Sequence, residues 1–359
     1  MRFHLISLPH TQTTEDYAAC AFTEKVRKFC IMMMNLGHEV FLYAGEYNDA
    51  PCTEHIQCLS EEERANTLDG KHFTTASFDY SLPHWVKFNQ NVIDGIKARH
   101  KERDFILSIA GLANKSVSDA FPHPYYQFVE FGIGYGGSFA RYRVFESYAW
   151  MHATYGAQGP RNNPNALDGV WYDDVIPGYF EVEKFPFSDK KEDYYLFVGR
   201  LTERKGYKIA EEVCKHLNKR LILAGVGDTP TYGEYVGVIN PRQRGDLMRK
   251  ARAVFVPTIY IEPFGNVAVE AMACGTPVIC TDWGAMTETV IDGVTGFRCR
   301  SLQEFVDATE KVKDLNPWGI RTHAMNNYSL PVVGLRYQAY FQRLLTLWGA
   351  GWYQLKEAA

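Results

Sequence analysis

The chain has 359 residues, of which 46% are hydrophobic and 22% are charged, and its formal net charge is −4. This length exceeds what one hydrophobic core normally needs, so we expect two domains. The acidic balance argues against a protein that coats nucleic acid through bulk positive charge. No apolar stretch approaches ~20 residues, so no membrane-spanning helix is expected. The first residues have a strand pattern rather than that of a signal peptide.

The eight cysteines are spread along the chain without any Cys-x-x-Cys pair. Most of them lie in apolar patterns, where cysteine acts as a small hydrophobic residue. Cys52 and Cys58, with His55 between them, fit no common spacing of zinc ligands. We therefore expect a reduced, cytoplasmic setting and no metal site.

The beginning of the chain predicts one βαβ unit. Its strand, helix and second strand are expected over residues 2–8, 22–36 and 39–44. Thr13 or Thr14 would be a suitable N-cap of the helix, and Asp16, three residues after Thr13, would complete a capping box.

The rest of the first half predicts further α/β elements. A helix is expected over residues 86–99, and strands are expected over 104–109 and 125–130. The second strand runs into residues 131–138, the most glycine-dense loop in the chain. An aromatic-rich helix and a last short strand are expected over residues 143–152 and 171–176. The charged stretch 180–193 contains a proline and has no sustained period, which indicates a linker.

The second half begins with a strand over 194–198 and repeats the same alternation of strands and helices up to residue 297. This rhythm predicts a second doubly wound parallel sheet. A final helix over 335–348 has apolar residues on more than one narrow stripe. We expect it to pack across both domains.

One loop of the second half has the features of an anion site. Residues 253–257 predict a strand, and the helix that follows is expected to end at Gly275. Glu262 is therefore expected at the carboxyl end of the strand, and Glu270 about two turns into the helix. Open α/β sheets bind ligands at such strand ends. The helix N-terminus offers free N–H groups to a diphosphate, and the two carboxylates would hold hydroxyls.

Several motifs occur in order through residues 194–300, where the pattern is most specific. They are Val198-Gly199-Arg200, Lys205-Gly206, Glu262-Pro263-Phe264-Gly265 with Glu270, Gly275-Thr276-Pro277-Val278-Ile279 and Gly293-Val294-Thr295-Gly296-Phe297, with Val175-Ile176-Pro177-Gly178 before them. Together they resemble the family-four retaining glycosyltransferases of the GT-B fold. The resemblance is weak in the first half of the chain.

This resemblance implies two doubly wound Rossmann-like domains that face a cleft. The expected parts are an acceptor-side domain over 1–180, a nucleotide-sugar-binding domain over 194–330 and, over 331–359, a C-terminal helix that crosses back to the first domain. It also implies a nucleotide-sugar donor, with UDP- or GDP-sugars favoured, and no cofactor or metal.

The resemblance also implies roles for single residues. Arg200 and Lys205 would take up the charge of the leaving diphosphate, as cations commonly do for developing negative charge. Glu262 would contact the hydroxyls of the donor sugar, and Glu270 those of the ribose. The backbone amides of four residues would complete the anion site, namely Phe264, Gly265, Asn266 and Val267.

Two positions in the first half depart from the family pattern. The loop after the first strand carries Thr11 and Gln12 where the family commonly has glycines. Their side chains would bind the nucleotide-sugar donor in place of glycine amides, unless the loop only caps a helix and faces solvent. Glu130 stands where the family often has a histidine. Its carboxylate would act on the sugar or the acceptor hydroxyl, or would pair with Arg141 or Arg143 and fix the loop.

We therefore expect retaining transfer of a sugar to a hydroxyl of a saccharide, a lipid-linked acceptor or a small molecule. The first half also resembles glycosyltransferases of bacteriophages, some of which modify hydroxymethylated bases of DNA. That alternative, which would place the chain in a host cytoplasm, is not favoured by the acidic charge. A non-catalytic sugar-nucleotide-binding protein is a second alternative.

Overall fold

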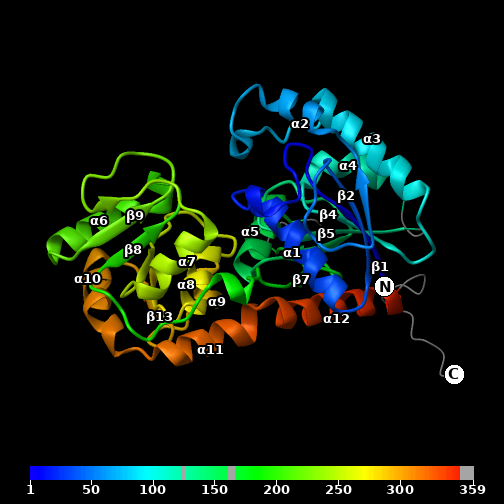
Figure 1. Cartoon of the computed structure of the whole chain (residues 1–359). Coiled ribbons are helices and arrows are strands. Elements are labelled where there is room, and N and C mark those ends of the chain that lie inside the picture. The colour runs from blue at the N-terminus through cyan, green and yellow to red at the C-terminus, as the bar shows by residue number, and fades with distance from the viewer. Residues whose placement is uncertain (123–125, 161–165, 348–359) are drawn as a thin grey trace, which may run out of the picture. The chain divides into compact units, whose positions relative to one another are not determined.

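The computed structural model describes residues 1–122, 126–160 and 166–347 (Figure 1). The chain divides into two compact units. Unit 1 comprises residues 1–145, 159–176 and the C-terminal segment from Gly334, and unit 2 comprises residues 146–158 and 177–333. Residue 125, where a strand was expected to begin, and Trp348, where the last helix was expected to end, lie outside the described residues.

Unit 1 is built on a parallel sheet of seven strands in the order β3-β2-β1-β4-β5-β6-β7. The strands are β1 (Arg2–Ile6), β2 (Glu39–Ala44), β3 (Glu54–Gln57), β4 (Phe105–Ser108), β5 (Gln127–Ile133), β6 (Tyr142–Phe145) and β7 (Asp174–Val175). Its helices include α1 (Ala21–Asn35), α2 (Glu61–Leu68), α3 (Pro83–Lys97) and α4 (Lys115–Ala120). The strand order reverses between β1 and β4, which makes the loops after these strands the expected ligand-binding edge.

Unit 2 has a six-stranded parallel sheet in the order β10-β9-β8-β11-β12-β13. The strands are β8 (Tyr195–Val198), β9 (Leu221–Ala224), β10 (Glu234–Tyr235), β11 (Val254–Val256), β12 (Val278–Thr281) and β13 (Gly296–Cys299). Here the order reverses between β8 and β11. The loops that follow these two strands therefore lie at the topological switch point of the sheet.

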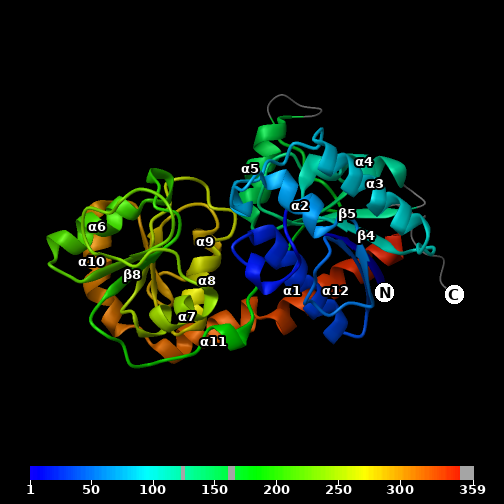
Figure 2. The same ribbon diagram turned by 45° about the horizontal axis from the view of Figure 1, so that its top comes forward.

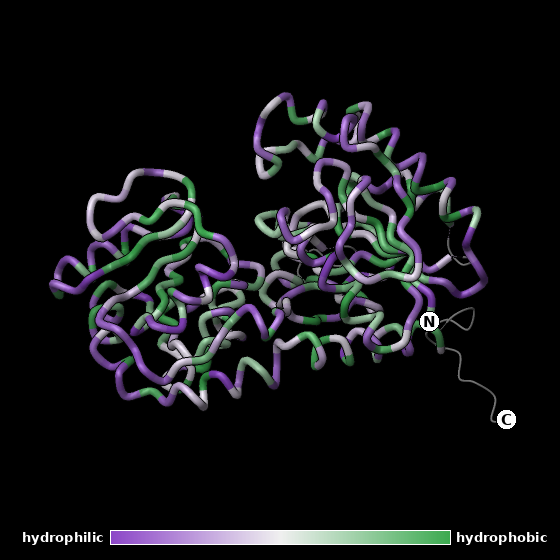
Figure 3. Tube along the Cα trace, in the orientation of Figure 1, coloured by the Kyte–Doolittle hydropathy of each residue, from purple (hydrophilic) through white to green (hydrophobic). Residues whose placement is uncertain are grey.

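The helices of unit 2 cover both faces of its sheet (Figure 2). These helices are α6 (Tyr207–His216), α7 (Pro241–Lys250), α8 (Asn266–Ala273), α9 (Met286–Thr289), α10 (Leu302–Lys311) and α11 (Pro317–Tyr328), and the unit also contains α5 (Tyr148–Gln158). One core joins α6 and α10 to the sheet, and a second joins α7, α8 and α11 to the opposite face. Successive strand residues alternate between the two cores, and apolar residues accordingly follow the strands in Figure 3.

Helix α12 (Leu330–Leu347) begins in unit 2 and continues into unit 1 from Gly334. Within unit 1 it packs on the sheet through aromatic rings, because the ring centre of Phe341 lies 4.8 Å from that of Phe3 and 4.9 Å from that of Phe105. Tyr337 packs on Phe29 in the same way at 5.5 Å. The wide apolar surface predicted for this helix is therefore buried, and the expected crossing helix is confirmed.

Two local predictions in the first half are wrong. Thr14 makes no side-chain capping bond, and the hydroxyl of Thr13 instead bonds to that of Ser7 at 2.9 Å. A 3-10 turn intervenes there, and α1 begins only at Ala21. The helix expected over 143–152 begins only at Tyr148, and residues 142–145 form strand β6 between β5 and β7, because the extended pairing satisfies their backbone groups.

No helix among residues 1–122, 126–160 and 166–347 has both the length and the apolar character that crossing a membrane requires.

Candidate functional site

The loops after β8 and β11 contact each other through their backbones. Gly206, which precedes α6, has a φ of +72°, and a Cβ atom there would lie 1.9 Å from the carbonyl oxygen of Pro257. The amide of Ile259 donates to the carbonyl of Arg204 at 2.8 Å. This close approach is open only to glycine, and it brings Lys205 beside the segment that leads to Glu262.

Lys205, Tyr260 and Glu262 form a closed hydrogen-bonded cluster. The Lys205 Nζ donates to the Tyr260 hydroxyl at 2.6 Å and to the Glu262 Oε2 at 2.8 Å. The Tyr260 hydroxyl donates to the same Oε2 at 2.6 Å. Burial and the Glu262 carboxylate raise the pKa of Tyr260, so its hydroxyl stays protonated and remains a donor.

Glu262 lies farther from its strand than expected. Strand β11 ends at Val256, and Glu262 follows after five loop residues rather than at the strand end. The backbone of Glu262 is held by the loop after β12, since the amide of Ala285 donates to its carbonyl at 3.0 Å. Gly284 packs against it so closely that a Cβ atom would lie 2.8 Å from the Glu262 nitrogen. The carboxylate therefore projects from a fixed backbone.

Glu270 is the fifth residue of α8, a little more than one helical turn from its start rather than two. Its side chain is buried, and its Oε1 accepts a bond from the Arg244 Nη2 at 3.0 Å. Arg244 lies on α7, which packs on the same face of the sheet as α8. The salt bridge offsets the cost of burying the carboxylate and fixes its direction.

The remaining residues predicted in unit 2 surround the start of α8. Gly265 is the N-cap with a φ of +84°, Asn266 is exposed and Val267 is half-buried. The ring of Phe264 is buried against Tyr328, with ring centres 5.7 Å apart. Phe264 is thus a core residue that anchors the loop. Arg200 is exposed, and its charge acts on Tyr260, whose pKa it lowers in part.

Helix α5 is attached to the same loop within unit 2, although its residues fall in the range 1–180 expected for the first domain. The Ser147 hydroxyl donates to the Pro263 carbonyl at 2.7 Å. The Glu288 carboxylate accepts the amides of Tyr148 and Ala149 at 2.9 and 2.7 Å, and so caps the helix. His152 lies on this helix.

In unit 1, Thr11 and Gln12 are buried and bonded internally. The Thr11 hydroxyl bonds to that of Thr23 at 2.7 Å. Gln12 donates to Glu61 at 2.5 Å and accepts the amide of Tyr47 at 2.9 Å. The loop therefore does not face solvent, and these side chains shape it through contacts within the unit.

Glu130 lies on β5 and is fully buried. Its Oε2 accepts the amides of Phe139 and Ala140, each at 2.7 Å, so the carboxylate closes the glycine-rich loop through the backbone. Arg143 instead forms a two-bond ion pair with Asp173, at 2.6 and 3.0 Å. Burial raises the pKa of Glu130 to about 7, although the two amides and the charge of Arg143 oppose the shift.

This shift predicts a pH dependence of stability. The usual pKa of glutamate is 4.5, so protonation of Glu130 stabilises the fold fully below that pH, and this contribution is lost as the pH rises through about 7. Across this pH range the contribution to the free energy of unfolding amounts to up to about 3 kcal/mol, and we expect Glu130→Gln to remove it. Urea unfolding of both proteins from pH 4.5 to 8 measures it. If the free energy of unfolding changed with pH in the same way in both proteins, the raised pKa would not belong to Glu130.

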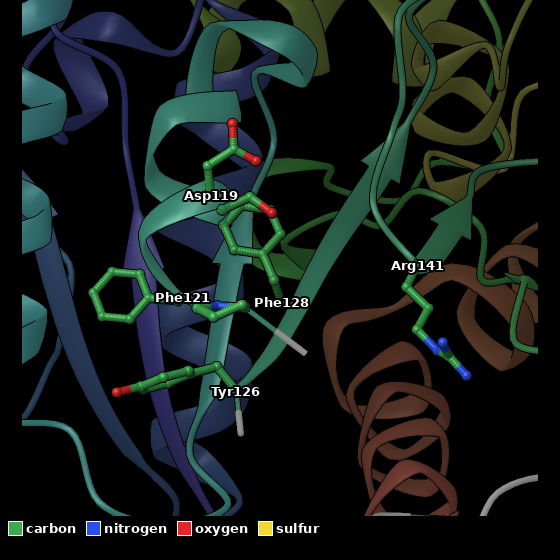
Figure 4. Close-up of a pocket in the computed structure, with 7 residues that line it drawn as sticks. Asp119, Phe121, Tyr126, Phe128 and Arg141 are labelled. Atoms are coloured by element: carbon green, nitrogen blue, oxygen red, sulfur yellow. The ribbon is translucent and has the colours of Figure 1, made fainter. Parts of the chain in front are cut away.

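A hollow of about 260 Å³ lies in unit 1 between α4 and the start of β5 (Figure 4). The side chains that the figure labels are Asp119, Phe121, Tyr126, Phe128 and Arg141. Asp119 is already paired with Lys115, and the guanidinium of Arg141 lies 5.3 Å from the ring centre of Tyr172. The hollow is at the amino-terminal edge of the sheet, and none of the predicted site residues lines it.

Most of unit 2 matches a known protein family. Residues 180–329 match the family model of group 1 glycosyl transferases. These residues are a group 1 glycosyltransferase domain. The glycosyltransferase domain contains Arg200, the cluster of Lys205, Tyr260 and Glu262, and Glu270.

Curated relatives support this assignment over part of their length. An uncharacterized glycosyltransferase of Methanocaldococcus jannaschii is 31% identical over 193 residues, which are 46% of this chain and 49% of that protein. A D-inositol 3-phosphate glycosyltransferase of Mycobacterium sp. is 34% identical over 158 residues, 37% of this chain and 36% of that protein. The matched part of the chain thus spans about half the length of these relatives or less.

Solved structures share the fold of the whole chain. AviGT4, a glycosyltransferase involved in avilamycin A biosynthesis, superposes with a TM-score of 0.68 at 19% identity, over 96% of this chain and 98% of that one. Sucrose-phosphate synthase from Thermosynechococcus elongatus gives 0.66 at 17% identity, over 96% and 99%. Anabaena HepE in complex with UDP and glucose gives 0.62 at 15% identity, over 96% and 100%. The fold is GT-B.

Two residues of the glycosyltransferase domain that contact the predicted carboxylates were not predicted from the sequence. Tyr260 contacts Lys205 and Glu262, and Arg244 contacts Glu270. Tyr260 stands two residues before the motif glutamate, a position that could have drawn notice. Arg244 lies among other basic residues of α7, and nothing in the local pattern singles it out.

Proposed function

We propose that the chain is a retaining glycosyltransferase that moves a sugar from a nucleotide-sugar donor to an acceptor hydroxyl. The observation that carries this proposal is the cluster of Lys205, Tyr260 and Glu262 at the switch point of a group 1 glycosyltransferase domain. A cation and a carboxylate that lie together at the carboxyl edge of the sheet suit a ligand that has both a diphosphate and hydroxyl groups.

In this proposal each side chain has one task. Lys205 and the exposed Arg200 receive the negative charge that develops as the nucleoside diphosphate leaves. Glu262 accepts hydrogen bonds from hydroxyls of the donor sugar. Glu270, whose carboxylate is oriented by Arg244, accepts hydrogen bonds from the ribose hydroxyls. The amides at the start of α8 add their partial positive charge to the diphosphate site.

The proposed donor class is a UDP- or GDP-sugar. The fold neighbour HepE has been solved with UDP and with UDP-glucose, which makes UDP-sugars the first donors to test, followed by GDP-sugars. Among the described residues, no group of three or more His, Cys, Asp and Glu side chains is arranged to hold a metal ion. We propose that the side-chain cations neutralise the diphosphate.

For the acceptor side, we propose that Glu130 acts by fixing the loop that it closes. Its two amide bonds and its burial support this role over direct contact with the sugar. Thr11 and Gln12 would act similarly, by setting the loop after β1. The acceptor itself is proposed only as a hydroxyl compound.

The role of Glu262 is tested with the substitution Glu262→Gln. The amide keeps the shape but loses the charge, so we expect the kcat/KM for the nucleotide sugar to fall about 10- to 100-fold. Calorimetry should find that the affinity for the nucleoside diphosphate is not weakened, since Glu262 is assigned to the sugar and loss of its charge removes a competitor for the Lys205 ammonium. Glu203→Gln, in the exposed part of the loop after β8, is the matched control. Equal loss of both ligands would count against the assignment.

A further inference from the structure

The hydroxyl of Tyr260 links two side chains to which the proposed function gives different tasks. It accepts a hydrogen bond from the Lys205 Nζ at 2.6 Å and donates one to the Glu262 Oε2 at 2.6 Å. Lys205 and Glu262 also contact each other directly at 2.8 Å. Both carboxylate bonds go to the same oxygen, so the second oxygen of Glu262 takes part in neither.

The ring of Tyr260 is itself held in place. The Arg204 guanidinium lies 5.0 Å from its ring centre, within the range of cation–π attraction, while the Lys205 Nζ is bonded to its hydroxyl. The preceding residue, Ile259, is bonded to the Arg204 carbonyl. The ring is half-buried, so the hydroxyl has a defined position between the cation and the carboxylate.

We propose that Tyr260 is a positioning residue for glycosyl transfer, a role that rests on the proposed function. Without a donor, the ammonium of Lys205 is paired with Glu262. A diphosphate that enters the site competes for this ammonium. The Tyr260 hydroxyl keeps its bond to the Glu262 Oε2 during this exchange, so Lys205 can turn to the diphosphate while Glu262 keeps its other oxygen directed at the sugar.

Loss of the hydroxyl leaves Lys205 as the partner of the Oε2 in this cluster. The ion pair then has to break fully before the ammonium can serve the diphosphate, and Glu262 loses a neutral donor that holds it. A hydrogen bond to a charged group such as the Glu262 carboxylate is stronger than one between two neutral groups. The effect of Tyr260 is therefore expected to pass through Glu262.

The test is a double-mutant cycle with Tyr260→Phe and Glu262→Gln. The kcat for release of nucleoside diphosphate is measured at a saturating concentration of a nucleotide sugar that the wild-type protein consumes. Tyr260→Phe alone should lower kcat about 10- to 100-fold. In the Glu262→Gln background the same substitution should lower it less than about 3-fold, because the carboxylate through which it acts is gone. Tyr195→Phe is the control, since it removes a buried hydroxyl of the same unit that donates to the Thr309 carbonyl at 2.9 Å. It should leave kcat unchanged.

The outcomes separate this inference from the proposed function. An active wild-type protein with an unimpaired Tyr260→Phe variant would overturn the inference alone. Equal losses in both backgrounds would also overturn it, because they indicate a structural role that does not pass through Glu262. A wild-type protein that consumes no nucleotide sugar would overturn the proposed function, and the inference with it.

Discussion

Lys205→Ala is expected to lower the turnover of sugar transfer by two to three orders of magnitude. Such a loss is typical when one group that stabilises developing charge is removed. Two hydrogen bonds hold the Lys205 Nζ at the proposed site before a donor binds, so its charge is close to the diphosphate when the bond to the sugar breaks. The neighbouring carboxylate keeps the bond from Tyr260, so the variant should fold.

The measurement is the initial rate of nucleoside diphosphate release at saturating donor, with circular dichroism to confirm folding. Lys208→Ala provides the matched control, because Lys208 is an exposed lysine on α6 three residues farther along. Its rate should equal that of the wild type. Near-normal transfer by a folded Lys205→Ala protein would remove Lys205 from the mechanism.

Gly206→Ala is expected to destabilise unit 2 by about 2 to 4 kcal/mol. A left-handed residue with a side chain costs roughly 1 to 2 kcal/mol, and crowding in a packed region adds a similar amount or more. At Gly206 both apply, since φ is +72° and the new Cβ would lie 1.9 Å from the Pro257 carbonyl oxygen. The two loops would have to separate, so the distance between Lys205 and Glu262 should also change and activity should fall.

Gly293→Ala separates the two causes. Gly293 has a φ of +70°, but nothing lies within 4 Å of the position that a Cβ would take. It should therefore show only the conformational cost, about 1 to 2 kcal/mol. Thermal or urea unfolding of the two variants gives the comparison. If both variants lose the same free energy of unfolding, crowding against the Pro257 carbonyl adds nothing to the cost of Gly206→Ala.

The fold was predictable because its signals are local. Apolar runs such as residues 195–198 and 254–256, separated by amphipathic helices, predict parallel strands, and the structure confirms both sheets. The crossing helix α12 was also predictable, since its aromatic residues cover more of its circumference than a surface helix needs. The strand β6 was not, because a short aromatic run suits a helix or a strand, and its partners β5 and β7 decide.

The site was predictable only where a motif lies in one stretch of sequence. The motif around Glu262 gave the carboxylate, and the glycine after Lys205 gave the turn. The contact between them depends on a backbone approach between loops more than 50 residues apart, which no periodicity encodes. The same holds for Arg244, whose bond to Glu270 depends on how α7 packs beside α8. The roles of these residues in catalysis stay predictions.

The central claim is that the chain transfers a sugar from a nucleotide donor with retention of configuration. Proton NMR of the wild-type protein with UDP-glucose, and then with other UDP- and GDP-sugars, tests it most directly. Even without an acceptor, slow transfer to water should release nucleoside diphosphate from at least one donor. The first sugar anomer formed should have the configuration of the donor, and Lys205→Ala should abolish the signal. Inversion at the anomeric carbon, or no consumption of any donor by a folded protein, would contradict the account.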